Sequence, residues 1–487
     1  MDYARFASQK LLKGARLLSL GLLVAMAGGL LSALAGCGVS DAGAPQDKET
    51  AATGGRATSL EAKPAANPPA DWPNWRGPGG KGIAVGSRLP EKWPDNSPEP
   101  IWTQALGTGW SSPVVVENRV YITDRQKNTE RLLAIDAASG KPLWEVTNPV
   151  DFDPHAVGRR HGNGPKSTPV VAGNRVYSLG IAGWLQAVDA ATGKVIWHVN
   201  LPEQFGRHEP LASGKAFVNG TENVIVPIGK GQGAPVPLFG YTGSLLLADR
   251  LLVLSVGGER GGTIMAFDID DGHVVWKSLD EHPSYSSPVV ADLGDVRQVV
   301  VMTGPRVVGL QLSDGRLLWS YPFQIQYDES ISTPAIGDDL VLVTGDSRPL
   351  TALEIPKSGL SPDRPITPRV AWENFDLSSY LSSMLAHDGH VYGMGDEGGF
   401  VCLRQRDGKR LWSGGNHGTY CSPVLAGKQL LGLNEEGELA VLDASPQAYR
   451  EIALLPLANG QTWTMPAVVG NRIFIRSTNA VSAFEFP

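Results

Sequence analysis

One pattern recurs through most of this chain. A Ser/Thr-Pro step opens a short apolar strand, a turn leads to a second strand, and a third strand ends in a Gly turn that precedes a Trp. The first copy runs from Ser112 and Pro113 to Trp144. A repeated unit of four short strands is typical of a propeller blade, which packs only on its neighbours. A chain of 487 residues can therefore form one ring rather than several separate cores.

Eight copies of the unit align on the Pro position. The aligned residues are Pro113, Pro169, Ser244, Pro288, Pro334, Met384, Pro423 and Pro466. The tryptophans of the fourth strands are Trp144, Trp197, Trp276, Trp319, Trp372 and Trp412. The turn glycines supply the positive φ that these hairpins need. Each Trp is expected to wedge between adjacent blades, where it buries a large apolar area.

The eighth copy ends without a Trp strand, and a matching strand from Pro100 to Leu106 precedes the first copy. We predict that this strand completes the last blade and leaves only short, protected edges. The predicted fold is all-β: an eight-bladed β-propeller of four-stranded antiparallel blades over residues 100–487, closed by an N-terminal strand. Residues 71–99 form an extension whose Trp72 and Trp75 pack on the ring. Residues 37–70 lack aromatic side chains and are predicted to be a disordered tether.

The first 36 residues have the pattern of an export signal. Several basic residues precede an uncharged apolar run, residues 17–34. The run leads into Leu-Ala-Gly-Cys, which resembles the lipobox of bacterial lipoproteins and implies cleavage before Cys37 and lipid attachment to it. The alternative is an uncleaved anchor, because about 18 apolar residues just span a bilayer. We expect a lipid-anchored, periplasm-facing protein of the cell envelope, with Gly38 favouring the outer membrane.

Charge and cysteine content exclude several classes of protein. A net charge of -7 argues against nucleic-acid binding, which needs a clustered basic surface. The three cysteines form no CxxC or haem-attachment motif, so no metal site is assigned. Cys402 and Cys421 either form a disulfide or remain two buried thiols.

The unit Asp-Ala-x-Thr-Gly-Lys-x-x-Trp, present from Asp189 to Trp197, resembles the pyrroloquinoline-quinone-type repeat. This repeat occurs in quinoprotein alcohol dehydrogenases and in the propeller lipoprotein of the outer-membrane β-barrel assembly machinery. The motif from Asp71 to Pro78 is also similar to the start of many bacterial proteins in this group. The resemblance covers residues 100 to 487 and implies the fold, but it does not discriminate between the activities.

Strand direction places the blade connections and the second-to-third-strand hairpins on one face, here called the top face. The position three before each aligned residue should point into the upper funnel: Trp110, Lys166, Tyr241, Tyr285, Ile331, Leu381, Tyr420 and Trp463. An aromatic ring there either suits a flat ligand or an extended peptide, or only closes the core. The longest inserts, 147–166 and 200–240, carry further candidates on this face. These are His155, Arg159, Arg160, His161, Asn163, Arg207, His208 and Glu209.

Acidic residues also gather at the top hairpins: Asp124, Glu259, Asp346, Asp396, Glu397 and Glu435. They are either Ca²⁺ ligands together with backbone carbonyls, or solvated turn formers. No catalytic residue is assigned, because the linear sequence shows no Ser-His-Asp order, phosphate loop or paired catalytic carboxylates.

Three functions remain as hypotheses, and we favour the first. It is a monomeric, non-enzymatic scaffold that binds envelope proteins or peptides, as the resemblance to the assembly lipoprotein implies. The second is a quinoprotein oxidoreductase, in which the resemblance implies pyrroloquinoline quinone stacked on Trp110 or Trp463, with Ca²⁺ beside it and an Asp as general base. The chain lacks the adjacent Cys-Cys pair of many such enzymes and any haem motif. Recognition of a sugar or polymer by the aromatic ring is a third hypothesis.

Overall fold

The computed structural model describes residues 70–154, 158–206, 216–218, 221–224, 229–230, 235–258, 262–325 and 329–487. Contacts divide the chain into two units, Met1–Lys63 and Pro64–Pro487, and every described residue belongs to the second. The predicted export signal, the lipidation site Cys37 and nearly all of the tether lie outside the described residues. None of the described helices is long and apolar enough to cross a membrane.

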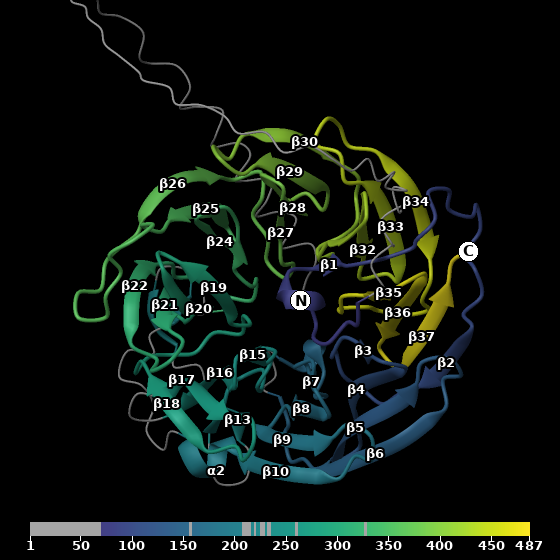
Figure 1. The fold of residues 1–487 in the computed structure, drawn as a ribbon, viewed down its shortest axis with the longest axis horizontal. Helices are drawn as coiled ribbons and strands as arrows, with labels where there is room; N and C mark the ends of the chain where they lie inside the picture. The colour runs from purple at the N-terminus through teal and green to yellow at the C-terminus, as the bar shows by residue number, and fades with distance from the viewer. Residues whose placement is uncertain are drawn as a thin grey trace, which may run out of the picture. The chain divides into compact units, whose positions relative to one another are not determined.

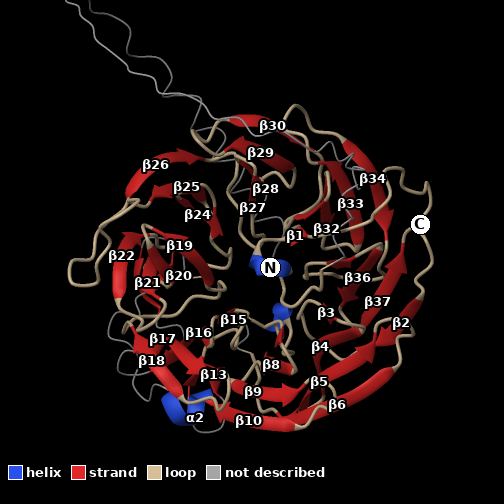
Figure 2. Ribbon diagram, viewed as in Figure 1, coloured by secondary structure: helices blue, strands red, loops and turns tan. Residues whose placement is uncertain are grey.

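The second unit is a ring of eight β-sheets around a central axis (Figure 1). Within the described residues, helical structure is limited to three short segments (Figure 2): η1 (Pro78–Gly80), η2 (Arg159–His161) and α2 (Leu201–Phe205). In each sheet the first strand lies at the axis and the fourth at the rim.

The first four blades follow one another in the chain. Blade 1 consists of β3 (Val114–Val116), β4 (Arg119–Gln126), β5 (Thr129–Asp136) and β6 (Pro142–Pro149). Blade 2 consists of β7 (Val170–Ala172), β8 (Arg175–Leu179), β9 (Trp184–Asp189) and β10 (Val195–Asn200). Blade 3 consists of β15 (Leu246–Ala248), β16 (Leu251–Gly258), β17 (Gly262–Asp268) and β18 (Val274–Ser278). Blade 4 consists of β19 (Val289–Leu293), β20 (Val296–Met302), β21 (Arg306–Gln311) and β22 (Leu317–Pro322).

The remaining blades complete the ring. Blade 5 consists of β23 (Ala335–Ile336), β24 (Leu340–Gly345), β25 (Arg348–Glu354) and β26 (Arg369–Asn374). Blade 6 consists of β27 (Leu385–His387), β28 (His390–Met394), β29 (Phe400–Arg404) and β30 (Arg410–Gly414). Blade 7 consists of β31 (Val424–Ala426), β32 (Gln429–Leu433), β33 (Glu438–Asp443) and β34 (Glu451–Pro456). Blade 8 consists of β35 (Ala467–Val469), β36 (Arg472–Ser477), β37 (Ala480–Glu485) and β2 (Trp102–Ala105).

The N-terminal strand closes the ring. β2 pairs antiparallel with β37, from Trp102 opposite Ala483 to Ala105 opposite Ala480. The predicted eight-bladed fold and its closure are therefore confirmed. The insert after blade 2 contains two further strand pairs: β11 (Ala216–Val218) with β12 (Thr221–Val224), and β13 (Gly229–Lys230) with β14 (Pro235–Val236).

The tryptophans of the repeat join neighbouring blades. The indole N–H of Trp144 donates to the carbonyl of Ala190 in blade 2 over 3.1 Å. Its ring covers Gly193, whose φ is 74° and where a Cβ would lie 2.7 Å from the indole. The same bond is made to the following blade by Trp102, Trp197, Trp276, Trp372 and Trp412. Trp319 differs, because its N–H donates to Gln298 of its own blade over 2.6 Å.

A belt of hydrogen bonds runs around the axis at the Ser/Thr position of the repeat. In blades 1 to 6 the backbone amide at this position donates to the side-chain hydroxyl of the next blade over 2.9–3.2 Å. The belt residues are Ser112, Thr168, Ser244, Ser287, Thr333, Ser383, Ser422 and Met465. The amide of Met465 donates to Ser112 over 3.0 Å, so the last blade is bonded to the first.

The belt corrects one register in the sequence alignment. Ser244 occupies the Ser/Thr position, and β15 begins two residues later, so Leu245 is the residue aligned with Pro113. The third copy has no proline to mark this position. Thr242, rather than Tyr241, is therefore three residues before the aligned position in this blade.

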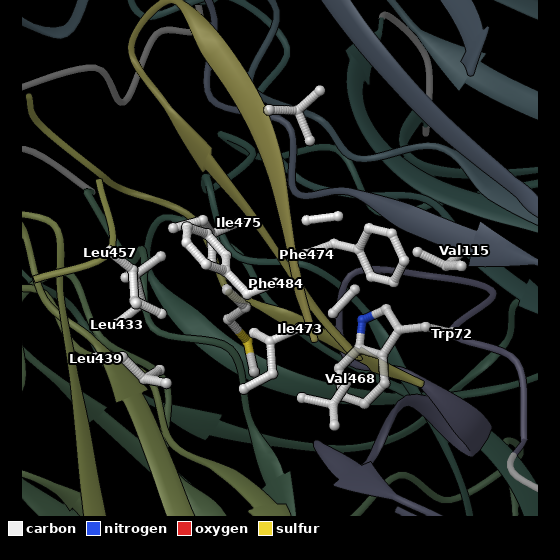
Figure 3. Packing of buried hydrophobic residues seen from close by; sticks show 14 of the residues in the cluster. Trp72, Val115, Leu433, Leu439, Leu457, Val468, Ile473, Phe474, Ile475 and Phe484 are labelled. Carbon is white, nitrogen blue, oxygen red and sulfur yellow. The ribbon is translucent and has the colours of Figure 1, made fainter. Parts of the chain in front are cut away.

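Residues 70–93, called the plug below, fill the ring near its axis on the side opposite the top face. The amide of Trp72 donates to Val115 of β3 over 2.6 Å, and the carbonyl of Trp72 accepts from the same residue over 2.9 Å. β1 (Ile83–Ala84) pairs parallel with β31 of blade 7. Figure 3 shows Trp72 among side chains from blades 1 and 8, including Val115, Val468 and Phe474. The plug therefore connects blades that are far apart in the sequence.

Cys402 and Cys421 are both buried and unpaired. Of the two alternatives that the sequence leaves open, the structure contains the free thiols. Burial raises the pKa of the Cys402 thiol to about 12, so it has little thiolate character.

Candidate functional site

With the register corrected, eight equivalent positions surround the axis at the top face. They are Trp110, Lys166, Thr242, Tyr285, Ile331, Leu381, Tyr420 and Trp463. Seven of these residues are the ones that the repeat offset selects in the sequence, and their role in binding stays a prediction. Tyr241 instead is buried beside Ile181 and Gly183 in the core of blade 2, and burial raises its pKa.

Aromatic side chains from five connections between blades form a continuous row at the top of the ring. The ring centroids of Trp110 and Trp463 lie 4.9 Å apart, and those of Trp463 and His161 lie 5.3 Å apart. The row continues from His161 to Phe239 at 5.5 Å and from Phe239 to Tyr285 at 5.2 Å. We call these five residues the aromatic row. Contacts of this length and tilt stabilise aromatic clusters, so the row is a preformed apolar surface.

Lys166 holds the aromatic row from below. Its ammonium group donates to the carbonyl of Phe239 over 3.2 Å and to that of Gly162 over 3.4 Å. These carbonyls belong to the two segments that carry Phe239 and His161. The indole N–H of Trp110 also donates to the carbonyl of His161 over 3.1 Å. The two inserts are therefore tied to each other and to the ring at the axis.

A buried carboxyl group, that of Glu130, interacts electrostatically with Lys166. Glu130 of β5 accepts a hydrogen bond from the amide of Ile181 over 2.9 Å. Burial raises the pKa of Glu130 to about 7, although the charges of Arg125 and Lys166 oppose the shift. Burial also lowers the pKa of Lys166 to about 8 and that of His161 to about 4. At neutral pH the imidazole of His161 is therefore uncharged, as its place in an aromatic row requires.

The titration of Glu130 should make stability depend on pH. The pKa of Glu130 is higher in the folded chain than the ordinary 4.5. Its contribution to the free energy of unfolding is therefore fully present below pH 4.5 and is lost as the pH rises through about 7. Glu130→Gln removes this titration. We expect the free energy of unfolding of the variant, relative to the unchanged chain, to increase by about 3 kcal/mol between about pH 4.5 and about pH 8. Urea unfolding at both pH values measures this change.

The exposed Glu203 of α2 offers a control for this prediction. Glu203→Gln should leave the difference from the unchanged chain nearly the same at both pH values. If the free energy of unfolding of Glu130→Gln, relative to the unchanged chain, is also the same at both pH values, Glu130 does not titrate in this range.

Two of the acidic residues of the top hairpins, Asp124 and Glu435, have structural partners. Both carboxylate oxygens of the buried Asp124 accept from Arg131, at 2.8 and 2.5 Å, and one also accepts from the amide of Gly107. Glu435 accepts from the amides of Thr419 and Tyr420 over 2.9 and 2.7 Å. Glu259 lies outside the described residues. Of the two alternatives, Asp124 and Glu435 therefore serve as hairpin and loop formers in this structure.

The aromatic row leaves no room for a quinone between Trp110 and Trp463. A flat ring between two aromatic faces needs about 7 Å, twice the contact distance of about 3.5 Å. Trp110 and Trp463 are 4.9 Å apart and therefore contact each other directly. The carboxylates of Asp124 and Glu435, two candidates for an adjacent Ca²⁺, are occupied by protein donors. We therefore derive no step through pyrroloquinoline quinone or Ca²⁺.

The other insert candidates divide into two groups. Arg159 is exposed and lies 3.9 Å from Asp153. Arg160 donates to the imidazole of His161 over 2.9 Å. His155, Arg207, His208 and Glu209 lie outside the described residues and remain predictions.

Sequence reasoning missed two residues of this site. Phe239 lies at the end of an irregular insert, where no repeat position identifies it. Glu130 is a charged residue at a strand position that alternation alone does not mark as buried. Its strand also contains Arg131 and Asp136, so no sequence signal singles it out.

Comparison with known proteins decides the family. A family model described as outer membrane protein assembly factor BamB matches residues 94–179 and 150–414. The chain belongs to the BamB family. BamB of Burkholderia pseudomallei (strain K96243) is 23% identical over 363 residues, which are 69% of this chain and 86% of that protein. BamB of Yersinia pestis is 24% identical over 251 residues, 50% of this chain and 55% of that protein.

Quinoproteins are related over shorter stretches. The dehydrogenase subunit of the quinone-dependent alcohol dehydrogenase of Gluconacetobacter polyoxogenes is 29% identical over 173 residues, 34% of this chain but 19% of that protein. The BamB family and the quinoproteins therefore share the repeat, as the sequence resemblance implied.

Solved structures show the same fold. The crystal structure of BamB from Moraxella catarrhalis superposes with a TM-score of 0.50 at 17% identity, covering 80% of this chain and 99% of that one. Quinohemoprotein alcohol dehydrogenase from Comamonas testosteroni gives a TM-score of 0.57 at 14% identity, covering 86% and 81%. At these identities the likeness establishes the propeller and leaves the function to the site.

Proposed function

We propose that this BamB-family chain is a lipid-anchored propeller of the cell envelope, facing the periplasm. In this proposal it binds envelope proteins as a non-enzymatic, monomeric scaffold in outer-membrane protein assembly. Cys37 carries the lipid, and residues 37–70 tether the ring. Family membership supports the envelope location, and the Leu-Ala-Gly-Cys motif supports the anchor.

The observation that carries this proposal is the aromatic row, held in place by Lys166. Trp463, Trp110 and Tyr285 are half-buried, so each presents part of a ring to solvent while the rest is fixed by packing. Rigid aromatic side chains of this kind dominate the energy of protein interfaces because they lose little conformational entropy on binding. The backbone carbonyls around the row are largely bonded within the ring, so an extended peptide would bind mainly through apolar contact.

Trp463→Ala tests the proposal in cells that lack the chromosomal copy of this chain. The unchanged chain is expected to restore the amounts of outer-membrane β-barrel proteins, and Trp463→Ala is expected to restore them poorly. Loss of one central aromatic anchor typically weakens binding by about 2 kcal/mol, or roughly 30-fold. The amounts are measured by quantitative mass spectrometry of outer membranes.

Lys141→Ala is the matched control, because Lys141 is exposed in a turn on the opposite face. Both variants must first show unfolding midpoints close to that of the unchanged chain. Full restoration by Trp463→Ala would show that the aromatic row is not needed for the proposed function. Saturable binding of pyrroloquinoline quinone with Ca²⁺ that Trp463→Ala abolishes would instead favour the oxidoreductase hypothesis.

A further inference from the structure

The rim of blade 4 carries an added strand from the chain itself. The segment between β25 and β26 leaves blade 5 and runs next to β22 (Figure 1). Ile366 in this segment bridges Trp319 in parallel orientation. Its amide donates to the carbonyl of Leu318 over 3.1 Å, and its carbonyl accepts from the amide of Ser320 over 3.0 Å. This contact is a β-augmentation of an outer edge within one chain.

The added segment changes what the edge exposes. Leu318 and Trp319 beneath it are completely buried, and Ile366 packs into the same apolar cluster. Pro365 and Pro368 flank Ile366 and favour an extended backbone that donates few hydrogen bonds. The segment therefore offers one amide, one carbonyl and one aliphatic side chain to the edge. The amide and the carbonyl bond the free backbone groups of β22, and the side chain covers its apolar surface.

Among the described residues, no further strand pairs with the same edge in the three preceding blades. Leu143, Ile196 and Val275 are equivalent to Leu318, since each precedes the repeat Trp of its outer strand. They are 49%, 43% and 42% exposed, although the chain has few exposed large apolar residues. The outer strands of these blades share with β22 the bulge at this point. Because these positions are equivalent in the repeat, the carbonyl of Leu143 and the amide of Glu145 point outward. The carbonyl of Leu318 and the amide of Ser320 do the same in blade 4.

We propose that the outer edge of β6 binds an extended segment of a partner protein in which an aliphatic residue lies between prolines. The segment pairs in parallel with Leu143–Glu145 and covers Leu143, as Ile366 covers Leu318. β6 is the best developed of the three edges, because it is eight residues long and Leu143 is the most exposed of the three side chains. This surface lies at the rim, separate from the aromatic row, and its test does not depend on the proposed function.

The probe for this edge is a synthetic peptide with the sequence of residues 361–369, carrying a benzophenone at its N-terminus. Irradiation with the full chain should crosslink the peptide to residues 142–149, as mapped by mass spectrometry. Glu145→Pro removes the outward amide but is tolerated at a rim strand, where that amide has no ladder partner. We expect this variant to lower the crosslink yield at β6 by about fivefold or more.

Two controls separate backbone pairing from other effects. Glu145→Ala loses the same ion pair with Arg131 but keeps the amide, so its crosslink yield should equal that of the unchanged chain. A peptide with the Ile366→Asp change should not crosslink at β6. Equal yields for Glu145→Pro and Glu145→Ala would overturn the proposal. Crosslinks confined to β22, which indicate exchange with the chain's own segment, or confined to the top face, would overturn it as well.

Discussion

Trp102→Ala is expected to lower the free energy of unfolding by about 3–5 kcal/mol, the usual cost of truncating a buried aromatic side chain. Trp102 is in β2, the strand that closes blade 8, and its indole N–H donates to Ala137 of blade 1 over 3.0 Å. The ring covers Gly140, where a Cβ would lie 2.6 Å away, and its centroid is 6.1 Å from that of Phe474. The variant therefore weakens the contact between the two ends of the propeller. Denaturant unfolding followed by Trp fluorescence measures the loss.

Ile101→Ala is the matched control, because Ile101 precedes Trp102 and its side chain is 45% exposed. It should change the free energy of unfolding by no more than about 0.5 kcal/mol. Hydrogen exchange should also increase in β37, the strand paired with β2, in the Trp102 variant alone. If Trp102→Ala unfolds at the same denaturant concentration as Ile101→Ala, the closing strand does not limit the stability of the ring.

Trp72→Ala is expected to have an effect of similar size, about 3–5 kcal/mol. Trp72 is completely buried between the plug and blades 1 and 8, and its backbone pairs with Val115 in both directions (Figure 3). A Cβ on Gly77 would lie 2.6 Å from the indole, so the plug backbone packs closely on this ring. The expected result is release of residues 70–93. Limited proteolysis and hydrogen exchange of the plug measure it together with the unfolding midpoint.

Trp72→Phe separates apolar burial from the shape of the indole in this prediction. The indole nitrogen of Trp72 is buried and has no hydrogen-bond partner among the described residues. Phenylalanine retains most of the apolar surface, so this variant should cost about 1 kcal/mol and keep the plug protected. Equal loss in both variants would show that the plug depends on the shape of the indole rather than on apolar burial.

The repeat made the fold predictable from sequence. Each blade is a local unit whose strands pair with their sequence neighbours, so turn glycines and tryptophans identify it without knowledge of distant contacts. Six docked tryptophans, including Trp102, follow this rule. Trp319 does not, because the segment around Ile366 replaces the usual turn beside it. The segment that replaces the turn is an insert, and an insert has no counterpart in the repeat from which it could be predicted.

The candidate site was predictable only in part. An offset counted from the aligned prolines located Trp110, Lys166, Tyr285 and Trp463, since a repeated backbone repeats side-chain directions. The same count gave Tyr241 in the third copy, where no proline marks the register and Thr242 is the equivalent residue. Phe239 and His161 join the aromatic row through insert conformations that no periodicity describes.

By itself the sequence predicted the four-strand blades, their order and the strand that closes the ring, because these depend on local turns and on a repeated apolar spacing; the structure decided for eight blades over seven. It also determined which connections reach the top face. Only the tertiary structure decided which side chains meet at the axis, that Glu130 is buried and interacts electrostatically with Lys166, and that residues 70–93 fill the ring from the opposite side. These contacts join residues tens to hundreds of positions apart, and their energies depend on burial and on distances that exist only once the ring has closed.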